Sequence, residues 1–269
     1  MATQTIPAGA VLTEPAVFTL PDPPRPVVGV NAGAPFATVN AAAGPLHGER
    51  IYFQPAASVP AAWPAIPAGV TSPVISIKPA VAAVLAGSLD APLSAFFAKA
   101  AAGSYVTLWH EGEDASNGLT AAQVLALHAR AYGLFKAAAP KAATYCQIFT
   151  GFSATNSRVT AFTAPGLPLY CVDAYQQAAS DTTAAKLGAW AAQVRAAVPA
   201  ARLAVTETNS SVPGGKAAWL TQAWEWALSQ DAPLFFPYFA NATQEADLRW
   251  DPSDTAMIAA LKEIAAAGG

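Results

Sequence analysis

The feature that most constrains the fold is a repeated alternation of short strand-like runs with longer helix-like segments. The runs are rich in β-branched and aromatic residues and are almost continuously apolar, which is typical of parallel strands buried on both faces. Eight strand–helix units favour closure into a barrel. We therefore predict the α/β class, with a single (β/α)8 (TIM) barrel over residues 26–269. The eight runs lie at 27–30, 51–54, 74–77, 105–109, 144–149, 169–173, 203–207 and 234–238.

The helix-like segments carry start signals, apolar faces and stop signals. Thr120 and Gln123 have the spacing of a capping box, and Pro140 and Pro199 stand where two helices should end. The early units are less regular, because four prolines between 60 and 73 leave little room for a helix. Apolar residues at helical spacing are Val124, Leu127, Ala131 and Leu134; Leu187, Trp190, Ala191 and Val194; Trp219, Ala223 and Trp226; and Ile258, Leu261 and Ala265.

Two of the strand-like runs deliver a glutamate where the strand should stop. Glu111 follows the run at 105–109 through His110, and Glu207 ends the run at 203–207. In a (β/α)8 barrel the active site lies at the carboxyl ends of the strands. Retaining glycoside hydrolysis needs two carboxyl groups in such a place, a general acid/base and a nucleophile about 5 Å apart. The alternative for each glutamate is that it merely caps the helix that follows.

With these residues in place, the chain resembles a glycoside hydrolase of clan GH-A, and most of all glycoside hydrolase family 26, whose activities centre on β-mannanases. The resemblance rests on the order of short motifs over residues 26–265. These motifs are Ile75 to Pro79, Gly87 to Asp90, His110-Glu111 after the fourth strand, Asp173-Ala174-Tyr175 after the sixth, and Glu207 after the seventh.

The resemblance implies a role for each of these residues. Glu111 is expected to be the general acid/base, with its pKa raised by an apolar setting, while Glu207 stays ionised as the nucleophile. Tyr175 is implied as the hydrogen-bond donor to Glu207, and Asp173 as a substrate-binding residue. His110 is expected to hydrogen-bond either the nucleophile or a sugar hydroxyl, the alternative being a purely structural histidine.

Further side chains are expected at the same end of the barrel, the mouth formed by the carboxyl ends of the strands. Asn31 and Gln54, after the first and second strands, can bind sugar hydroxyls. Tyr238 ends the eighth strand, where relatives often place a tryptophan under the scissile sugar, so it is either a stacking platform or a core residue. Weaker platform candidates are Phe149, Phe152 and Trp250, and Trp109 is expected to fill the barrel interior.

One segment departs from the family pattern. Family 26 mannanases have tryptophans soon after the His-Glu pair, whereas residues 111–118 here hold no aromatic residue. The preferred glycan is therefore open. Glu113 is a rival carboxylate in this segment, and we expect it to lie in a solvated loop.

The composition and net charge limit the classes of partner that the protein can bind. The chain of 269 residues is 54% apolar and 12% charged with a net charge of −3, which leaves no electrostatic footprint for nucleic acid or an anionic membrane. A neutral polysaccharide or oligosaccharide fits this balance. We find no signal-peptide pattern, so the protein is expected to act in the cell, to leave by another route, or to belong to a virion. Residues 1–25, rich in proline, are expected to form an extended arm that can attach the barrel to a larger particle.

The two cysteines, Cys146 and Cys171, lie in apolar runs. Buried free thiols are favoured, with a disulfide between neighbouring strands as the alternative, and neither has the ligand-spaced partners of a metal site.

The sequence thus predicts a retaining glycosidase for a β-linked polysaccharide that needs no metal or organic cofactor. The main alternative is a catalytically idle barrel that binds glycan, for example on a phage tail or a cell surface. A barrel enzyme for phosphorylated metabolites fits poorly, because neither of the last two strand ends leads into a glycine-rich phosphate loop.

Overall fold

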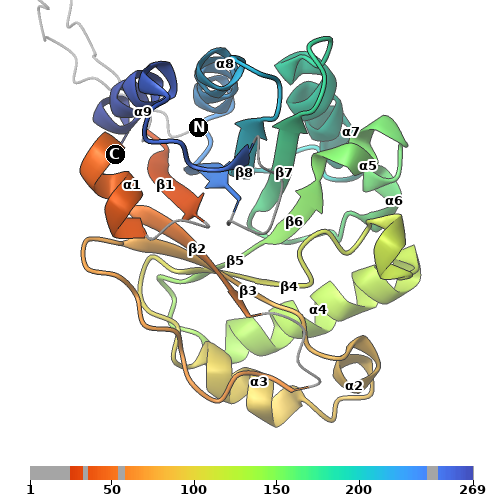
Figure 1. The fold of residues 1–269 in the computed structure, drawn as a ribbon. Helices are drawn as coiled ribbons and strands as arrows, with labels where there is room; N and C mark the ends of the chain where they lie inside the picture. The colour runs from red at the N-terminus through yellow and green to blue at the C-terminus, as the bar shows by residue number, and fades with distance from the viewer. Residues whose placement is uncertain (1–24, 33–35, 54–57, 241–247, 269) are drawn as a thin grey trace, which may run out of the picture.

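The computed structural model describes residues 25–32, 36–53, 58–240 and 248–268. Among them, nine parallel strands form one sheet in the order β5-β4-β3-β2-β1-β9-β8-β7-β6, and helices surround it (Figure 1). The two end strands, β5 and β6, are separated in sequence by Cys146 alone, so the sheet curls into a nearly closed barrel. The predicted single (β/α)8 barrel is confirmed. Of the predicted arm, residues 1–24 lie outside the described residues.

The strands follow the predicted runs with shifted ends. They are β1 (Val27–Ala32), β2 (Gly48–Phe53), β3 (Ser72–Ile77), β4 (Tyr105–Leu108), β5 (Thr144–Tyr145), β6 (Gln147–Thr150), β7 (Tyr170–Gln176), β8 (Leu203–Ser210) and β9 (Leu234–Phe239). The run at 144–149 was expected to be one strand and is two. The backbone N–H of Cys146 donates to Val106 in β4, whereas that of Gln147 donates to Leu169 beside β7, so the chain changes neighbour where the barrel closes.

The helices are α1 (Phe36–Ala43), α2 (Val81–Leu85), α3 (Asp90–Phe97), α4 (Ala121–Ala138), α5 (Gly151–Thr155), α6 (Val159–Phe162), α7 (Ala189–Ala197), α8 (Lys216–Ser229) and α9 (Thr255–Ala267). The predicted capping box is present, with Thr120 and Gln123 exchanging side-chain and backbone hydrogen bonds at the start of α4. Phe135, rather than the expected Leu134, completes the buried face of α4. As expected, residues 58–71, before β3, contain no helix.

Apolar side chains form two separate clusters. The larger one lies between the strands and the helices, and the smaller one fills the barrel. Gly48 makes room for this interior, since a Cβ on it would lie 2.2 Å from the ring of Phe236. Both cysteines are buried and free, as the sequence favours. No helix among the described residues has the length and apolar character needed to cross a membrane. The interior cluster consists of Val74, Cys146, Ile148, Leu169, Cys171, Ala204, Leu234 and Phe236.

Candidate active site

A β-bulge in β8 positions Glu207. Val172 of β7 pairs with Val205, but the next residue, Asp173, pairs with Glu207, so Thr206 is the extra residue. A bulge changes which side chains face each side of the sheet. The Thr206 hydroxyl donates to Asp173 Oδ1 at 2.8 Å. Glu207, expected at the end of its strand, instead lies inside β8, which continues to Ser210.

Three hydrogen-bond donors and one ion-pair partner, from three other strands, converge on the Glu207 carboxylate. Arg50 Nη1 lies 2.8 Å and Asn31 Nδ2 2.8 Å from Oε1. The hydroxyl of Tyr52 also donates to Oε1, and that of Tyr175 donates to Oε2. Donors to a carboxylate stabilise its charged form. Burial raises the pKa of Glu207, and the Arg50 guanidinium and the Asn31 amide act against that rise.

Sequence reasoning missed Arg50 and Tyr52. The second strand was expected to begin at residue 51, but it begins at Gly48, so Arg50 and Tyr52 alternate on its inner face. A charged residue within an apolar parallel strand must be paired when it is buried. The alternation of Gly48, Arg50 and Tyr52 was the available signal.

Asp173 pairs with the same nitrogen of Arg50 that lies beside Glu207. Arg50 Nη1 lies 2.6 Å from Asp173 Oδ1, and both side chains are almost fully buried. Burial raises the pKa of Asp173, and the Arg50 guanidinium lowers it. Asp173 was expected to bind substrate. With Oδ1 engaged by Arg50 and Thr206, and an exposed fraction of 1%, its position suits holding Arg50 better than contacting a sugar.

Glu111 lies in a strained turn after β4. Trp109 and Glu111 have φ angles of 52° and 56°, a region that residues other than glycine seldom occupy. The Glu111 backbone N–H donates to Ile148 at 2.7 Å, and Asn117 Nδ2 donates to the Glu111 carbonyl at 2.7 Å. These bonds fix the turn between β4 and β6 and so fix the backbone that carries the Glu111 carboxyl.

The Glu111 carboxyl has a very different setting from that of Glu207. No described residue donates a side-chain hydrogen bond to it. Burial raises its pKa to about 7, with a further contribution from Asp173, while the charges of Arg50 and Lys78 oppose the rise. The group is therefore protonated at mildly acidic pH.

His110 is half-buried, precedes Glu111 in the chain and makes no hydrogen bond to Glu207. Its ring meets Tyr52 edge-on at 5.4 Å, and its Nδ1 is buried without a described partner. Burial lowers its pKa well below the usual value, and the charges of Arg50 and Lys78 add to this effect. The expected hydrogen bond to the nucleophile is not seen, and a contact with a sugar hydroxyl stays a prediction.

Two neighbours of Glu111 differ from expectation. Trp109 was expected inside the barrel, yet β4 ends at Leu108 and Trp109 packs against the outer cluster, because its left-handed backbone turns it away from the strand alternation. Glu113 was expected in a solvated loop and is 1% exposed. Its Oε1 accepts a hydrogen bond from the Thr150 backbone N–H at 2.7 Å, and burial raises its pKa to about 8.

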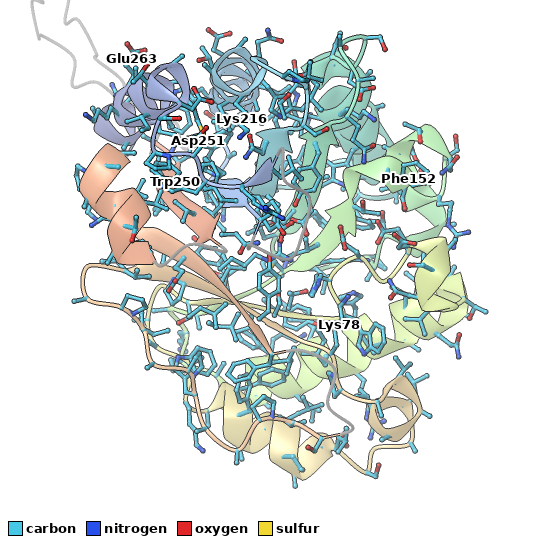
Figure 2. All side chains as sticks on the ribbon, in the orientation of Figure 1. Lys78, Phe152, Lys216, Trp250, Asp251 and Glu263 are labelled. Carbon is cyan, nitrogen blue, oxygen red and sulfur yellow. The ribbon has the colours of Figure 1, made fainter. Side chains whose placement is uncertain are left out.

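The candidate sugar platforms fall into three classes. Phe149 is fully buried and unavailable to a ligand. Tyr238 and Trp250 are half-buried, with Tyr238 edge-on to Tyr175 at 5.5 Å and Trp250 edge-on to Phe239 at 5.1 Å. Phe152 at the start of α5 is 60% exposed. Figure 2 places Phe152 and Lys78 on the side that carries α4 and α5, and Trp250 on the side that carries α8 and α9. Gln54 lies outside the described residues.

The described residues contain no group of three or more His, Cys, Asp or Glu side chains that could hold a metal ion. The charged residues of the mouth instead compensate one another, with Arg50 between the carboxylates of Asp173 and Glu207. Such an arrangement can hold one carboxylate ionised beside a second carboxyl that carries a proton.

No protein-family model matches the sequence, and no curated protein matches it. Solved structures do match the fold. A family 128 (subgroup I) endo-β-1,3-glucanase from Amycolatopsis mediterranei, in complex with laminaritriose, has a TM-score of 0.58 at 13% identity, over 88% of this chain and 98% of that one. A family 26 β-mannanase from Bacteroides ovatus has a TM-score of 0.58 at 12% identity, over 89% and 88%.

A family 128 (subgroup III) curdlan-specific exo-β-1,3-glucanase from Blastomyces gilchristii, in complex with glucose, has a TM-score of 0.55 at 13% identity, over 87% of this chain and 97% of that one. At such identities the likeness concerns the barrel fold. It includes a member of family 26, the family that the sequence resembles.

Proposed function

We propose that this protein is a retaining glycoside hydrolase that cleaves a β-linked glycan by double displacement. The observation that carries the proposal is the contrast between two carboxyl groups at one mouth. Glu207 accepts hydrogen bonds from three side chains and pairs with Arg50, whereas Glu111 receives no hydrogen bond from the described side chains and has a pKa of about 7. Pairs of carboxyl groups in opposed environments are what acid/base and nucleophile roles require.

The roles follow from these environments. Protonated Glu111 donates its proton to the glycosidic oxygen while the Glu207 carboxylate attacks the anomeric carbon from the other side of the ring. The bond to the leaving group breaks, and a covalent glycosyl-enzyme forms. Glu111, now ionised, takes a proton from water, which attacks the same carbon and releases the sugar. Arg50, Asn31 and Tyr175 orient Glu207 and balance its charge.

The substrate class is part of the proposal. The structural relatives named above comprise β-1,3-glucanases and a β-mannanase, which supports a β-linked polysaccharide, mannan-like or a related glucan. Asn31 is bound to Glu207 and therefore serves the nucleophile more directly than a sugar hydroxyl. His110 and Tyr238 remain as sugar-contacting residues. No metal, organic cofactor, nucleic acid or membrane enters this scheme.

The domain boundary is proposed at residue 25. Arg25 Nη1 donates to the Ala267 carbonyl at 2.8 Å, which joins the start of the barrel to its last helix. Residues 1–25 then form the arm that can attach the catalytic barrel, 26–269, to a larger particle.

The deciding experiment compares Glu111→Ala with Glu207→Ala on activated aryl β-glycosides. An aryl leaving group barely needs a proton, so Glu111→Ala should give a burst of aryl alcohol followed by slow turnover, because water then lacks its base. Glu207→Ala should give no burst, since no glycosyl-enzyme can form. Wild-type turnover in both variants would contradict the assignment.

The same samples test the stereochemistry. Retaining enzymes hold their carboxyl groups about 5 Å apart, whereas inverting enzymes need 6.5 Å or more. We therefore expect NMR of the first product to show the β-anomer. An α-anomer would contradict double displacement. If the parent protein binds glycans from a broad panel but cleaves none, the idle glycan-binding barrel is the better description.

A further inference from the structure

Lys78 is a cation at the mouth that the scheme above does not use. Along β3, alternate residues face the barrel interior: Val74 belongs to the interior cluster, and the Ser76 hydroxyl lies 3.4 Å from Arg50 Nε. The same alternation carries Lys78, the first residue after β3, to the rim of the barrel. Its side chain is half-buried.

The Lys78 ammonium is placed beside Trp109 but is not neutralised. Its Nζ lies 5.6 Å from the centroid of the Trp109 ring. The Trp109 indole is itself fixed, because its Nε1 donates to the Pro79 carbonyl at 2.6 Å. Lys78 makes no hydrogen bond or ion pair with any residue in the part of the chain that the structure describes. An ammonium group has three donors, so all three are open to an incoming acceptor.

The sheet order places Lys78 on the side of Glu111. β3 is hydrogen-bonded to β4, which precedes Glu111, and it lies four strands away from β8, which carries Glu207. Among the charged groups that act on the Lys78 ammonium, the Glu111 carboxyl has the largest effect, and it opposes the lowering of the Lys78 pKa by burial. In the proposed reaction the acid protonates the leaving-group oxygen. A donor beside the acid and far from the nucleophile therefore faces the leaving group.

We propose that Lys78 is a specificity-determining residue that binds the leaving-group sugar, with its ammonium donating hydrogen bonds to oxygen atoms of that sugar. The inference rests on the proposed hydrolase function and adds a substrate contact to it. The acceptor is either a hydroxyl oxygen or the carboxylate of a uronic acid, which present the same chemistry to an ammonium.

The test compares a glycan that has a leaving-group sugar with a glycosyl fluoride that has none. Near pH 5 a carboxyl with a pKa of about 7 is protonated whether or not Lys78 is present, so a change in the protonated fraction of Glu111 does not contribute to the result. For Lys78→Met we expect kcat/KM on an oligosaccharide to fall about 10- to 100-fold, mainly through KM, as for loss of a hydrogen bond from a charged donor. Activity on the fluoride should stay within about twofold of the parent, and Lys78→Arg should recover part of the oligosaccharide activity.

A matched control is Lys99→Met, which removes an exposed lysine whose Nζ donates to the Ala61 carbonyl at 2.7 Å. Unfolding midpoints establish that each variant is folded. A greater loss on a uronate-containing oligosaccharide than on a neutral one identifies a carboxylate acceptor, and equal losses identify a hydroxyl.

Two results separate failure of this inference from failure of the hydrolase function. If the parent cleaves both substrates and Lys78→Met changes both equally or neither, the Lys78 assignment is overturned and the hydrolase function stands. If the parent cleaves neither, the hydrolase function fails, and the Lys78 assignment fails with it.

Discussion

Removing the Arg50 side chain should destabilise the protein far more than removing any surface cation. The Arg50 guanidinium is fully buried and lies within 2.6 Å of Asp173 and 2.8 Å of Glu207. Arg50→Met keeps most of the side-chain volume but leaves two buried carboxylates without their cation. Loss of one partner from a buried ion pair costs about 3–5 kcal/mol, and the total free energy of unfolding of a domain is about 5–15 kcal/mol.

The matched control is Arg130→Met. Arg130 also pairs with a carboxylate, Asp90, at 2.5 Å, but the two side chains are 37% and 36% exposed. Solvent screens such a pair, so its loss should be far smaller than that of the Arg50 pairs. Urea denaturation of the parent and both variants, at equal ionic strength, measures the two differences directly.

The pH dependence gives a second test. Without Arg50, the main group that opposes the effect of burial on Asp173 and Glu207 is lost, so their folded-state pKa values rise further above the unfolded ones. A carboxyl group whose folded-state pKa lies above its unfolded one makes a contribution to protein stability that is lost as pH rises from the unfolded pKa to the folded pKa. Arg50→Met should therefore be closest to the parent at acid pH. Equal losses in Arg50→Met and Arg130→Met, or an Arg50 loss that grows as pH falls, would refute the reasoning.

Two further predictions concern catalysis. The proposed mechanism requires the protonated form of Glu111, whose pKa is about 7, so kcat/KM on a neutral oligosaccharide should fall as pH rises above about 7. A pH–rate profile without this alkaline fall would contradict the acid role of Glu111. Tyr175→Phe removes one hydrogen bond to the Glu207 carboxylate, worth about 1.5–3 kcal/mol, so kcat should fall about 10- to 100-fold, with a smaller loss in the free energy of unfolding measured in urea. An unchanged kcat would contradict the orienting role of Tyr175.

Most of the fold could be predicted from sequence patterns that involve only neighbouring residues. Strand-like runs, the capping box at Thr120 and the stop signals at Pro140 and Pro199 depend on residues close in sequence, and the structure follows them. The split of the run at 144–149 is not local. It arises because the first half, β5, pairs with β4, whereas the second half, β6, pairs with β7 near the other end of the sheet. The residues of the run alone do not indicate which strands will be their neighbours.

The candidate site was harder to predict for the same reason. Glu111 and Glu207 were predicted from their places at the ends of expected strands, and Tyr175 was predicted from the family resemblance. Arg50 was missed, since the carboxylates that allow its burial come from residues 123 and 157 positions away in the sequence, on β7 and β8. The bulge at Thr206 depends on the pairing of β7 with β8, and no residue pattern within 203–207 indicates it.

The prediction that Glu113 lies in a solvated loop was wrong, and the burial of its carboxyl has a measurable consequence. Its neighbours in sequence are polar and small, which is typical of a solvated loop, yet the Thr150 backbone N–H at the end of β6 donates to its carboxyl and Arg158 Nε donates to its carbonyl at 3.0 Å. The loop is thereby held against the barrel. The buried carboxyl, with a pKa of about 8, must then be protonated in the folded protein at neutral pH.

We therefore predict that Glu113→Gln changes the pH dependence of stability. The folded-state pKa of Glu113 lies above the unfolded one, so its contribution is complete below the unfolded pKa, about 4.5, and is lost as pH rises to about 8. Each pKa unit corresponds to about 1.4 kcal/mol, so the parent should lose several kcal/mol over this interval that the variant keeps. Gln can still accept the Thr150 hydrogen bond and cannot ionise. Urea denaturation should give similar stabilities near pH 5 and a more stable Glu113→Gln near pH 9; parallel pH profiles for the two proteins would show that Glu113 is ionised in the folded state.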